Sequence, residues 1–406
     1  MTDKKIVAVI FGGRSVEHDV SVLTGLQFLE ALNPTLYIGL PVYVDPLGGW
    51  WTGDALTRRS HYPITDDHYK ALTAVQLDLA TTSSGRPRLI AREKGFFGDK
   101  ALNIGFDIMV PAIHGSNGED GTLQGLLEFS AVPYTGCRLM GSALTMDKVA
   151  AKSWARQHGL PVLPELMLAR PKSGHYLDED GLKEDIKTVL AGFTYPYCVK
   201  PCNLGSSVGV SKADDFDGLM ASLIQVFRID SEAMIEPFVP NLAEYNIAVR
   251  RNDQSKVQTS AIERPSSDGD LLDFKNKYLS GDKGGPKLDT APSEGMASLN
   301  RTLNPQEIDE KQEKLIRSTA SALFDGMKLA GSVRIDFLCD SKSGEIWFNE
   351  VNTIPGSFAY FLWEGAEPPV SFLELTGNMI EEGFTLSANR LGNTSAGAGG
   401  SMIFKE

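Results

Sequence analysis

Two short segments near the C-terminus, GSVRIDFLCD and EIWFNEVN, carry polar side chains at alternate positions. Side chains two residues apart on a strand share one face, so Arg334 and Asp336 fall together, as do Glu350 and Asn352. The turn between the segments is short enough to place the two pairs side by side. Three oxygen donors beside an arginine would suit Mg²⁺, which is typically held by a few carboxylates and by substrate phosphates. A solvated face of an edge hairpin is the alternative, and spacing alone leaves both open.

A glycine- and serine-rich segment, KPCNLGSSVG, begins at Lys200 and lies between two predicted strands. Backbone N–H groups and hydroxyls in such a loop can surround phosphate oxygens. The loop is not a Walker-type phosphate loop, because the chain contains no G-x-x-x-x-G-K-[ST] motif. No G-x-G-x-x-G follows a strand either, which disfavours a dinucleotide enzyme. An ordinary hairpin loop is the alternative, and Lys148 and Lys200 could equally be surface lysines.

Three further segments place ionisable side chains where a ligand could bind. Glu17 and His18 follow a buried strand and a Gly-Gly turn, and His114 ends a second strand. The carboxyl ends of strands are the usual ligand-binding edge of an open α/β sheet. Lys277 and Tyr278, in DFKNKYLSGD, could reach a ligand or lie on a surface strand. A lone histidine at such a position is more often structural than ligand-binding.

The elements that must position these residues follow one sequence pattern in the N-terminal part of the chain and another further on. KKIVAVIFGG followed by EHDVSVLTGLQFLEAL, and FDIMVPAIHG followed by GTLQGLLEFSAV, predict strand–helix steps of an α/β domain. The segment from Gly48 to Phe97 is predicted to be an irregular insertion. Further on, the sequence predicts an amphipathic helix ended by Gly159 and Pro161, then a strand, loop and strand around the glycine-serine segment. The tail from about Ala388 is rich in Gly, Ser and Ala and is predicted to be disordered.

The chain has 406 residues, enough for roughly two to three domains. Its 52 acidic and 39 basic residues give a net charge of −13, which argues against a general nucleic-acid-binding surface. The four cysteines form no C-x-x-C motif, so reduced thiols are expected rather than a zinc or disulfide framework. No apolar run approaches the length of a membrane span, and the N-terminal apolar run is too short for a signal peptide. These features predict a cytoplasmic protein.

Taken in order, several motifs resemble those of the D-alanine–D-alanine ligases of the ATP-grasp superfamily. The motifs are GGRSVEHDVS, HGSNGEDGTLQG, MDK, KPCNLGSSVGVSK, EYNIAV, KNKY, RIDF and NEVNTIPG. The resemblance implies an α/β and α+β fold of three-domain ATP-grasp architecture. The expected regions are an N-terminal α/β substrate domain at 1–142 with an insertion at about 48–100, a central domain at 143–238, a C-terminal domain with the metal site at 239–387, and a flexible tail at 388–406.

The resemblance also implies the activity. Two D-alanines would be joined into D-alanyl-D-alanine through an acyl phosphate, with ATP and two Mg²⁺ ions, or Mn²⁺, as cofactors, for peptidoglycan synthesis. The expected partners are small amino acids and a second copy of the chain, with neither nucleic acid nor membrane. Carboxylates are poor electrophiles, which is why phosphorylation by ATP would come first. The amine would then attack, and a tetrahedral oxyanion needs preorganised donors.

Roles follow for individual residues that match the family's motifs. The ATP-binding residues would be Lys148, Lys200, Ser206, Ser207, Glu236, Glu244 and Lys277. The metal ligands would be Asp336, Glu350 and Asn352. The substrate-binding residues would be Glu17 on the ammonium group, His114 on the carboxylate, Lys277 and Ser357. The catalytic residues would be Glu17, Ser206 and Tyr278 as a hydrogen-bonded triad, and Arg334 with the N–H of Gly356 as the oxyanion site.

One segment departs from the family. In typical relatives a longer stretch follows Pro-Gly before a Leu-Trp pair, with a serine and a leucine that seat the second D-alanine. Here only the residues 357–361, SFAYF, intervene, and Ser357 is a displaced candidate for that serine. Tyr278 resembles the residue of peptide-forming members. The alternatives are a ligase that couples an amino acid to a different amine, and a non-catalytic nucleotide-binding regulator, which would not need the metal set or Arg334.

Overall fold

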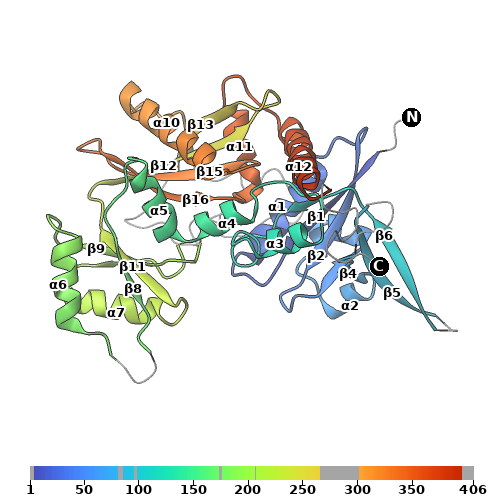
Figure 1. Cartoon of the computed structure of the whole chain (residues 1–406), viewed down its shortest axis with the longest axis horizontal. Coiled ribbons are helices and arrows are strands. Elements are labelled where there is room, and N and C mark those ends of the chain that lie inside the picture. The colour runs from blue at the N-terminus through green and yellow to red at the C-terminus, as the bar shows by residue number, and fades with distance from the viewer. Residues whose placement is uncertain are drawn as a thin grey trace, which may run out of the picture.

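The computed structural model describes residues 4–80, 86–95, 98–172, 176–205, 207–265 and 301–395. Three sheets organise these residues into an N-terminal, a central and a C-terminal region (Figure 1). The N-terminal region lies at one end of the molecule, and the other two regions face each other at the opposite end.

The N-terminal sheet has seven strands in the order β6-β5-β4-β3-β2-β1-β7. Its parallel part consists of β1 (Lys5–Gly12), β2 (Tyr37–Val44) and β7 (Ile108–Pro111). The helices that follow β1 and β7 are α1 (His18–Glu30) and α3 (Thr122–Phe129). Strands β1 and β7 are almost wholly apolar and buried, as expected for parallel strands covered on both faces. The two predicted strand–helix steps are therefore confirmed.

The segment after β2 is not irregular, and that prediction is wrong. It forms β3 (Trp50–Thr52), β4 (Thr73–Leu77), β5 (Arg88–Gly95) and β6 (Gly98–Gly105), interrupted by η1 (Asp54–Thr57), η2 (Arg59–His61) and α2 (Asp66–Tyr69). The strands extend the sheet in antiparallel pairing from β2. Because β5 carries several charged residues and β3 is very short, neither shows the apolar pattern that would have identified it from sequence.

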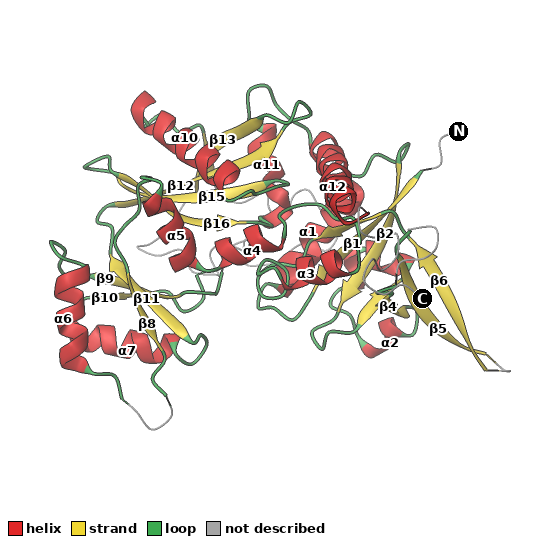
Figure 2. Cartoon of the chain, in the orientation of Figure 1, coloured by secondary structure: helices red, strands yellow, loops and turns green. Residues whose placement is uncertain are grey.

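The central region is a four-stranded antiparallel sheet in the order β10-β9-β11-β8. Its strands are β8 (Leu166–Ala169), β9 (Tyr197–Pro201), β10 (Ser211–Ala213) and β11 (Glu232–Pro237). Helices α6 (Glu179–Val189) and α7 (Phe216–Val226) pack on one face (Figure 2). The predicted strand–loop–strand is β9 and β10. The amphipathic helix is α5 (Lys148–Gln157), which starts after α4 (Leu139–Met146) where the Asp147 side chain caps the N–H of Ala150.

The C-terminal sheet has five strands in the order β14-β13-β12-β15-β16. They are β12 (Leu242–Arg251), β13 (Val257–Pro265), β14 (Arg301–Leu303), β15 (Val333–Asp340) and β16 (Ile346–Asn352). Helix α10 (Glu310–Gly326) covers one face, with Ile316, Ala320 and Leu323 packed against Ile335 and Phe348. The predicted hairpin is β15–β16, and its opposite face is free to line a site.

The chain ends by packing back on the N-terminal region. Segments η3 (Gly356–Ala359), α11 (Tyr360–Glu364) and α12 (Phe372–Ser395) follow β16, and their apolar side chains share one core with β1 and α1. In Figure 1, α12 lies between the N-terminal region and the C-terminal region. The structure corrects the prediction of a disordered tail from Ala388, because α12 continues to Ser395. Residues 396–406 lie outside the described part.

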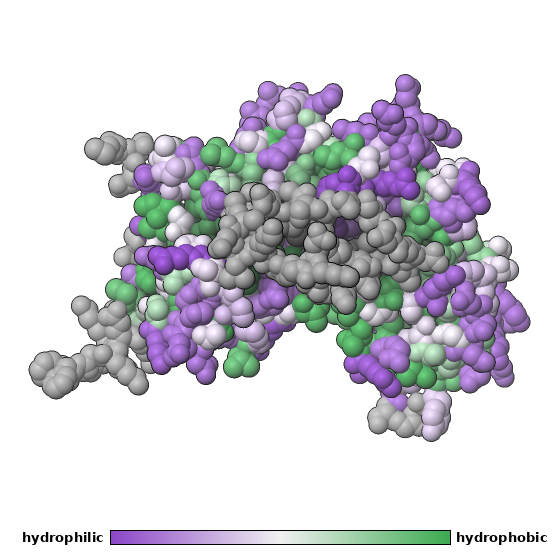
Figure 3. All heavy atoms as spheres, turned by 180° about the vertical axis from the view of Figure 1, so that it is seen from behind, coloured by the Kyte–Doolittle hydropathy of each residue, from purple (hydrophilic) through white to green (hydrophobic). Residues whose placement is uncertain are grey.

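The described surface mixes hydrophilic and apolar side chains (Figure 3). In the part of the chain that the structure describes, every helix is too short or too polar to cross a membrane. All four cysteines are buried and free of disulfides, in agreement with the expectation of reduced thiols.

Candidate active site

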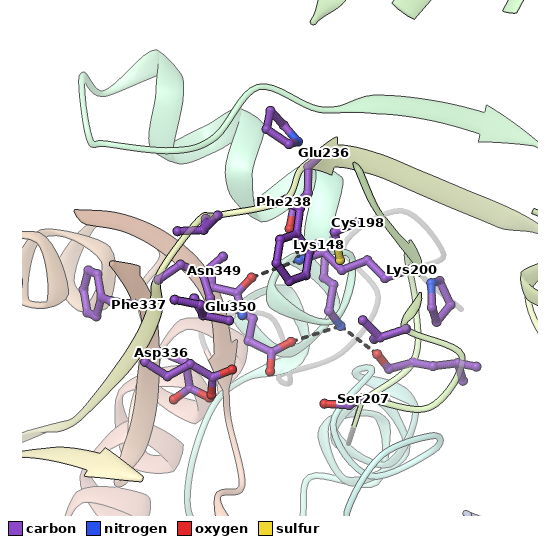
Figure 4. Close-up of a pocket in the computed structure, with 18 residues that line it drawn as sticks. Lys148, Cys198, Lys200, Ser207, Glu236, Phe238, Asp336, Phe337, Asn349 and Glu350 are labelled. Atoms are coloured by element: carbon purple, nitrogen blue, oxygen red, sulfur yellow. Dashed lines mark hydrogen bonds and ion pairs between the residues drawn. The ribbon is translucent and has the colours of Figure 1, made fainter. Parts of the chain in front are cut away.

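The hairpin places its polar pairs directly opposite each other. Asp336 faces Glu350, and Arg334 faces Asn352, so the predicted side-by-side arrangement is confirmed. The register then shifts, since Phe337 pairs with Phe348 and leaves Asn349 as an extra residue on β16. Such a bulge re-aims side chains. Asn349 and Glu350, although adjacent in sequence, both line the same pocket (Figure 4).

Cationic side chains converge on these oxygens. The Lys148 ammonium lies 3.2 Å from Glu350 Oε2 and donates to the carbonyl of Leu204 at 2.7 Å (Figure 4). Arg334 binds Asp336 through two parallel hydrogen bonds of 2.7 and 2.8 Å. Glu350 and Asp336 are thus each paired with a neighbouring cation. These cations come from α5 and β15, so the arrangement links the hairpin to the element that begins the central region.

A second charge cluster lies deeper, around Glu236 on β11. Its two oxygens accept from Lys200 at 2.6 Å and from Lys152 at 2.5 Å. Burial alone would raise the pKa of Glu236, but the charges of the two lysines lower it to about 2. Glu236 in turn outweighs the effect of burial on Lys200 and raises the pKa of that ammonium. Lys200 also donates to Asn349 at 3.0 Å, which joins this cluster to β16.

Sequence reasoning missed Lys152. It lies on α5 one turn after Lys148, so both lysines face the same side of the helix. Its side chain is only 1% exposed, and its ammonium is also 3.5 Å from Glu165. The available signal was the four-residue spacing, which by itself is common on exposed helices.

The pocket between these clusters is formed by two sheets. Lys200 and Glu236 come from the central sheet, and Asp336 and Glu350 from the C-terminal sheet. The pocket is also lined by polar and apolar side chains of both regions: Leu204, Ser207, Val210, Phe238, Leu242, Glu244, Phe337 and Leu338. Apolar walls suit a flat base, while lysines and a glycine-rich loop suit phosphates. The predicted residues Lys148, Lys200, Ser207, Glu236 and Glu244 are all brought together here.

Glu17 lies at the junction of the N-terminal and central regions. It precedes α1 and is buried. A Cβ atom at Gly115 would approach Glu17 Oε2 to 2.5 Å, and one at Gly205 to 3.3 Å. Gly115 also has a φ of +69°, which favours glycine. The two glycines therefore let the Glu17 carboxylate lie against the loop that carries Ser207.

His114 is buried beside α1, and its Nε2 lies 2.9 Å from the Thr24 hydroxyl. Burial, with a contribution from the Arg334 charge, lowers the pKa of His114 to about 3. The ring is therefore neutral over the physiological range. Thr24 also accepts the N–H of Ser357 at 3.0 Å. Helix α1 thus holds both His114 and the segment after β16.

Ser357 and Gly356 lie in this same buried region. The Ser357 hydroxyl donates to the side-chain oxygen of Gln27 on α1, so it would have to leave that partner to contact a substrate. Its predicted acceptor role, like that of Gly356 in the oxyanion site, stays a prediction.

Glu119 is a second residue that sequence reasoning missed. Its carboxylate accepts the backbone N–H groups of Gly115 and Ile354, both at 2.8 Å, and the hydroxyl of Thr353 at 3.3 Å. Burial and the nearby charge of Glu17 raise its pKa to about 7. It also lines a small pocket with Lys148, Gly205 and Asn352. Glu119 therefore ties the loop after β7 to the loop after β16, near the residues predicted to bind the substrate and the metal.

The donor set of the hairpin fits a hard cation. Among the described residues, no group of three or more His, Cys, Asp or Glu side chains is placed so that it could hold one metal ion. Asp336, Glu350 and Asn352 instead offer two carboxylates and an amide, and Asn352 already donates to Asp336 at 2.9 Å. Such a set suits Mg²⁺, provided that substrate phosphates complete the coordination. Ser206, Lys277 and Tyr278, also predicted for the site, lie outside the described residues.

A pocket between two antiparallel sheets, lined by the acidic residues of β15 and β16 and by Lys148 and Lys200, is typical of the ATP-grasp class of ATP-dependent ligases. Family models for the D-ala D-ala ligase N-terminus and C-terminus match residues 6–137 and 154–381. The chain belongs to the D-alanine–D-alanine ligase family and is an ATP-dependent carboxylate–amine ligase that uses a divalent metal.

Relatives and solved structures support this assignment. D-alanine–D-alanine ligase A of Bradyrhizobium diazoefficiens is 33% identical over 88% of both chains. The D-alanine–D-alanine ligase of Acetivibrio thermocellus is 32% identical over 94% of this chain and 96% of its own. The structure of the D-Ala:D-Ser ligase VanG from Enterococcus faecalis matches with a TM-score of 0.72 at 25% identity, over 94% of this chain and all of that one.

Proposed function

We propose that this protein joins two molecules of D-alanine into D-alanyl-D-alanine for peptidoglycan synthesis, by way of an acyl phosphate on the first. The observation that carries the proposal is the continuity of the site. The register of Arg334 and Asp336 against Asn352 and Glu350 aims the hairpin at the nucleotide pocket. A second pocket, of Glu119, Lys148 and Asn352, is also lined by Gly115 and Gly205, the two glycines that lie against Glu17.

On the donor side, Glu17 would bind the ammonium group of the first D-alanine. His114 is neutral, so it would offer an N–H to the carboxylate rather than a full charge. The Thr24 hydroxyl can donate to Nε2 while it accepts the N–H of Ser357, which would leave the proton of the ring on Nδ1.

On the nucleotide side, Lys148 and Lys200 would bind ATP phosphates, and Glu236 and Glu244 would contact the base and the ribose. Asp336, Glu350 and Asn352 would hold two Mg²⁺ ions, or Mn²⁺, which neutralise the charge that spreads over the transferred phosphoryl group. Arg334 and the N–H of Gly356 would stabilise the oxyanion that forms when the second amine attacks. Loss of one such donor typically costs about 10²–10³ in rate.

The assignments of Ser206, Ser207, Lys277 and Tyr278 to ATP and to the closing of the site belong to the same proposal. We also propose the domain limits 1–142, 143–238 and 239–387, a homodimer and a cytoplasmic location. The three sheets support three regions, while the homodimer and the cytoplasmic location follow from the resemblance to the family.

A ligase that couples an amino acid to a different amine is the second candidate. Two observations favour it. The segment after Gly356 is short and aromatic, and Ser357 is engaged with Gln27. One similar structure is that of a D-Ala:D-Ser ligase.

Phosphate release from ATP and Mg²⁺ separates the candidates. The assay is run with D-alanine alone and then with D-alanine plus a panel of other amines, including D-serine. We expect turnover with D-alanine alone and D-alanyl-D-alanine as the product by mass spectrometry. Turnover only in the presence of a second amine would select the second candidate, and no D-alanine-dependent turnover under either condition would contradict the leading proposal.

A further inference from the structure

One face of the C-terminal sheet carries a polar row that continues beyond the metal-binding strands. Glu350, Asp336, Asn246, Glu263 and Leu303 stand opposite one another across β16, β15, β12, β13 and β14. Directly paired residues of neighbouring strands share a face. The row therefore connects the predicted metal ligands with β14 at the far edge of the sheet.

Arg301 lies at the end of this row. It is two residues before Leu303 on β14, so both side chains project from the same face. Its Nη1 is 3.1 Å from Glu263 Oε1, and the two side chains are only 9% and 7% exposed. The other oxygen of Glu263 accepts from Asn246 at 3.2 Å. Glu263 thus orients Arg301 and connects it through Asn246 to the predicted metal ligands.

The guanidinium of Arg301 is also held by the aromatic segment that distinguishes this chain. It lies 3.7 Å from the centroid of the Phe361 ring. Burial lowers the pKa of Arg301, and the charge of Arg334 contributes in the same direction. Glu263 acts in the opposite direction and raises the pKa of Arg301. Arg334 shares a strand face with Asp336, so both guanidinium groups lie on the face of the sheet that carries the polar row.

Asn246 gives a separate indication that a ligand binds here. It is buried, and its side-chain oxygen has no hydrogen-bond partner among the described residues. A buried acceptor without a partner is costly, and most such atoms in native proteins find a donor. Asn246 lies between Glu263 and the metal ligand Asp336. A ligand with an N–H group on the metal side of Arg301 would satisfy it.

We propose that Arg301, stacked on Phe361 and oriented by Glu263, binds the carboxylate of the acceptor amino acid, with Asn246 accepting from the acceptor's amino group. The planar fork of a guanidinium matches a carboxylate in two-point geometry, and stacking on an aromatic ring fixes its plane. Arg301 and Phe361 would thereby replace the serine and leucine that are missing after Gly356. This inference rests on the proposed ligase activity and names the chemistry of its acceptor, an α-amino acid.

The test uses acceptors with and without a carboxylate. D-Alaninamide has no free carboxylate, so it can act only as acceptor while D-alanine acts as donor. For the wild-type chain we expect a KM for D-alaninamide well above that for D-alanine as acceptor. In Arg301→Gln we expect the acceptor KM for D-alanine to rise about 10- to 100-fold, the range for loss of a charge-assisted hydrogen bond. The KM for D-alaninamide should change little, so that the variant no longer discriminates.

Arg264→Gln is the matched control. Arg264 neighbours Glu263 on β13 but projects from the opposite face, where it pairs with Glu307 near the surface. We expect it to leave the acceptor KM unchanged. Arg301→Lys keeps the charge beside Glu263 but loses the fork, so it should restore acceptor binding only in part. It also serves for the same comparison if Arg301→Gln fails to fold.

Equal discrimination against D-alaninamide in the wild type and in Arg301→Gln, or no discrimination in the wild type, would overturn the inference. A wild type without any D-alanine-dependent turnover would instead contradict the proposed function. In that case the acceptor KM is compared between the amino acid that does support turnover and the same amino acid with its carboxylate converted to an amide. Discrimination that depends on Arg301 supports the inference, and its absence overturns it.

Discussion

Glu17 and Glu119 place two carboxylates close together in the candidate active site, and Glu119 accepts hydrogen bonds from the backbone N–H groups of Gly115 and Ile354. The pKa of Glu119 is raised to about 7, so the folded chain holds a proton there that the unfolded chain releases near pH 4.5. Where the folded state binds more protons, stability falls as pH rises. We therefore expect the titration of Glu119 to lower the free energy of unfolding by on the order of 2–3 kcal/mol as pH rises from about 4.5 to 7.

Glu119→Gln removes that titration. The amide has only one oxygen for the two N–H donors, so the substitution also changes the free energy of unfolding by an amount that does not depend on pH. The test is therefore how the difference between variant and wild type changes with pH. Urea unfolding at several pH values should show the variant gaining stability relative to the wild type between about pH 5 and 8. Glu345→Gln, an exposed change on the β15–β16 turn, is the control and should show no such trend. A difference between Glu119→Gln and the wild type that stays constant with pH would contradict the assignment.

At the level of single residues, alternation along the hairpin was enough to predict that Asp336, Glu350 and Asn352 come together. Asn349 could not be predicted, because the bulge that turns it toward Lys200 depends on the register between strands. Glu119 lies in a loop, and its partners Thr353 and Ile354 are more than 200 residues away in the sequence. Local patterns carry no information about contacts of that separation.

At the level of elements, α1 anchors the segment after β16. Thr24 contacts both the N–H of Ser357 and Nε2 of His114. Thr24→Val keeps the shape but removes the hydroxyl and leaves both groups unpaired in a buried setting. We expect a loss of about 1–3 kcal/mol in the free energy of unfolding, measured by urea denaturation. Acceptor KM should rise as well, since the segment that carries Phe361 loses a backbone anchor.

Thr188→Val on α6 is the control for this change. Its hydroxyl bonds only to the carbonyl of Glu184 within an exposed helix, so we expect a change of no more than about 0.5 kcal/mol. If Thr24→Val were as mild as the control, α1 would not be the anchor of this segment.

The same segment shows why some elements resist prediction. Ser357, Phe358 and Ala359 have φ values of 53°, 54° and 54°, a left-handed turn that residues other than glycine rarely adopt. The conformation costs roughly 1–2 kcal/mol per residue and persists only where tertiary contacts impose it. Here Ser332 donates to the carbonyl of Phe358, and Phe28 packs edge to face on its ring. The sequence indicated an unusual segment but not its shape. By contrast, β1, β7 and the hairpin follow directly from their apolar patterns.

For the whole molecule, a nucleotide in the proposed pocket should stabilise the arrangement of two regions, because the walls of the pocket belong to separate sheets. A ligand that contacts Lys200 and Glu236 on one wall and Asp336 and Glu350 on the other binds only the folded arrangement. At a concentration 100 times its Kd, such a ligand adds about 2.7 kcal/mol of stability. A non-hydrolysable β,γ-imido analogue of ATP should therefore raise Tm in a calorimetric scan, and more with Mg²⁺ than with EDTA. The metal matters because Asp336 and Glu350 otherwise place negative charge next to the triphosphate.

Glu350→Gln separates the two contributions to this shift. Because the change also removes the partner of Lys148, the comparison is between the Tm shifts caused by ligand and not between absolute values of Tm. We expect the variant to retain the metal-free shift caused by the analogue, to lose the increment caused by Mg²⁺, and to lose turnover. Glu345→Gln, on the same hairpin but exposed, should keep the full Mg²⁺ increment. If Glu350→Gln also kept the Mg²⁺ increment, Glu350 would not be a metal ligand. The stabilisation across the two sheets would then come from the lysines that bind the analogue.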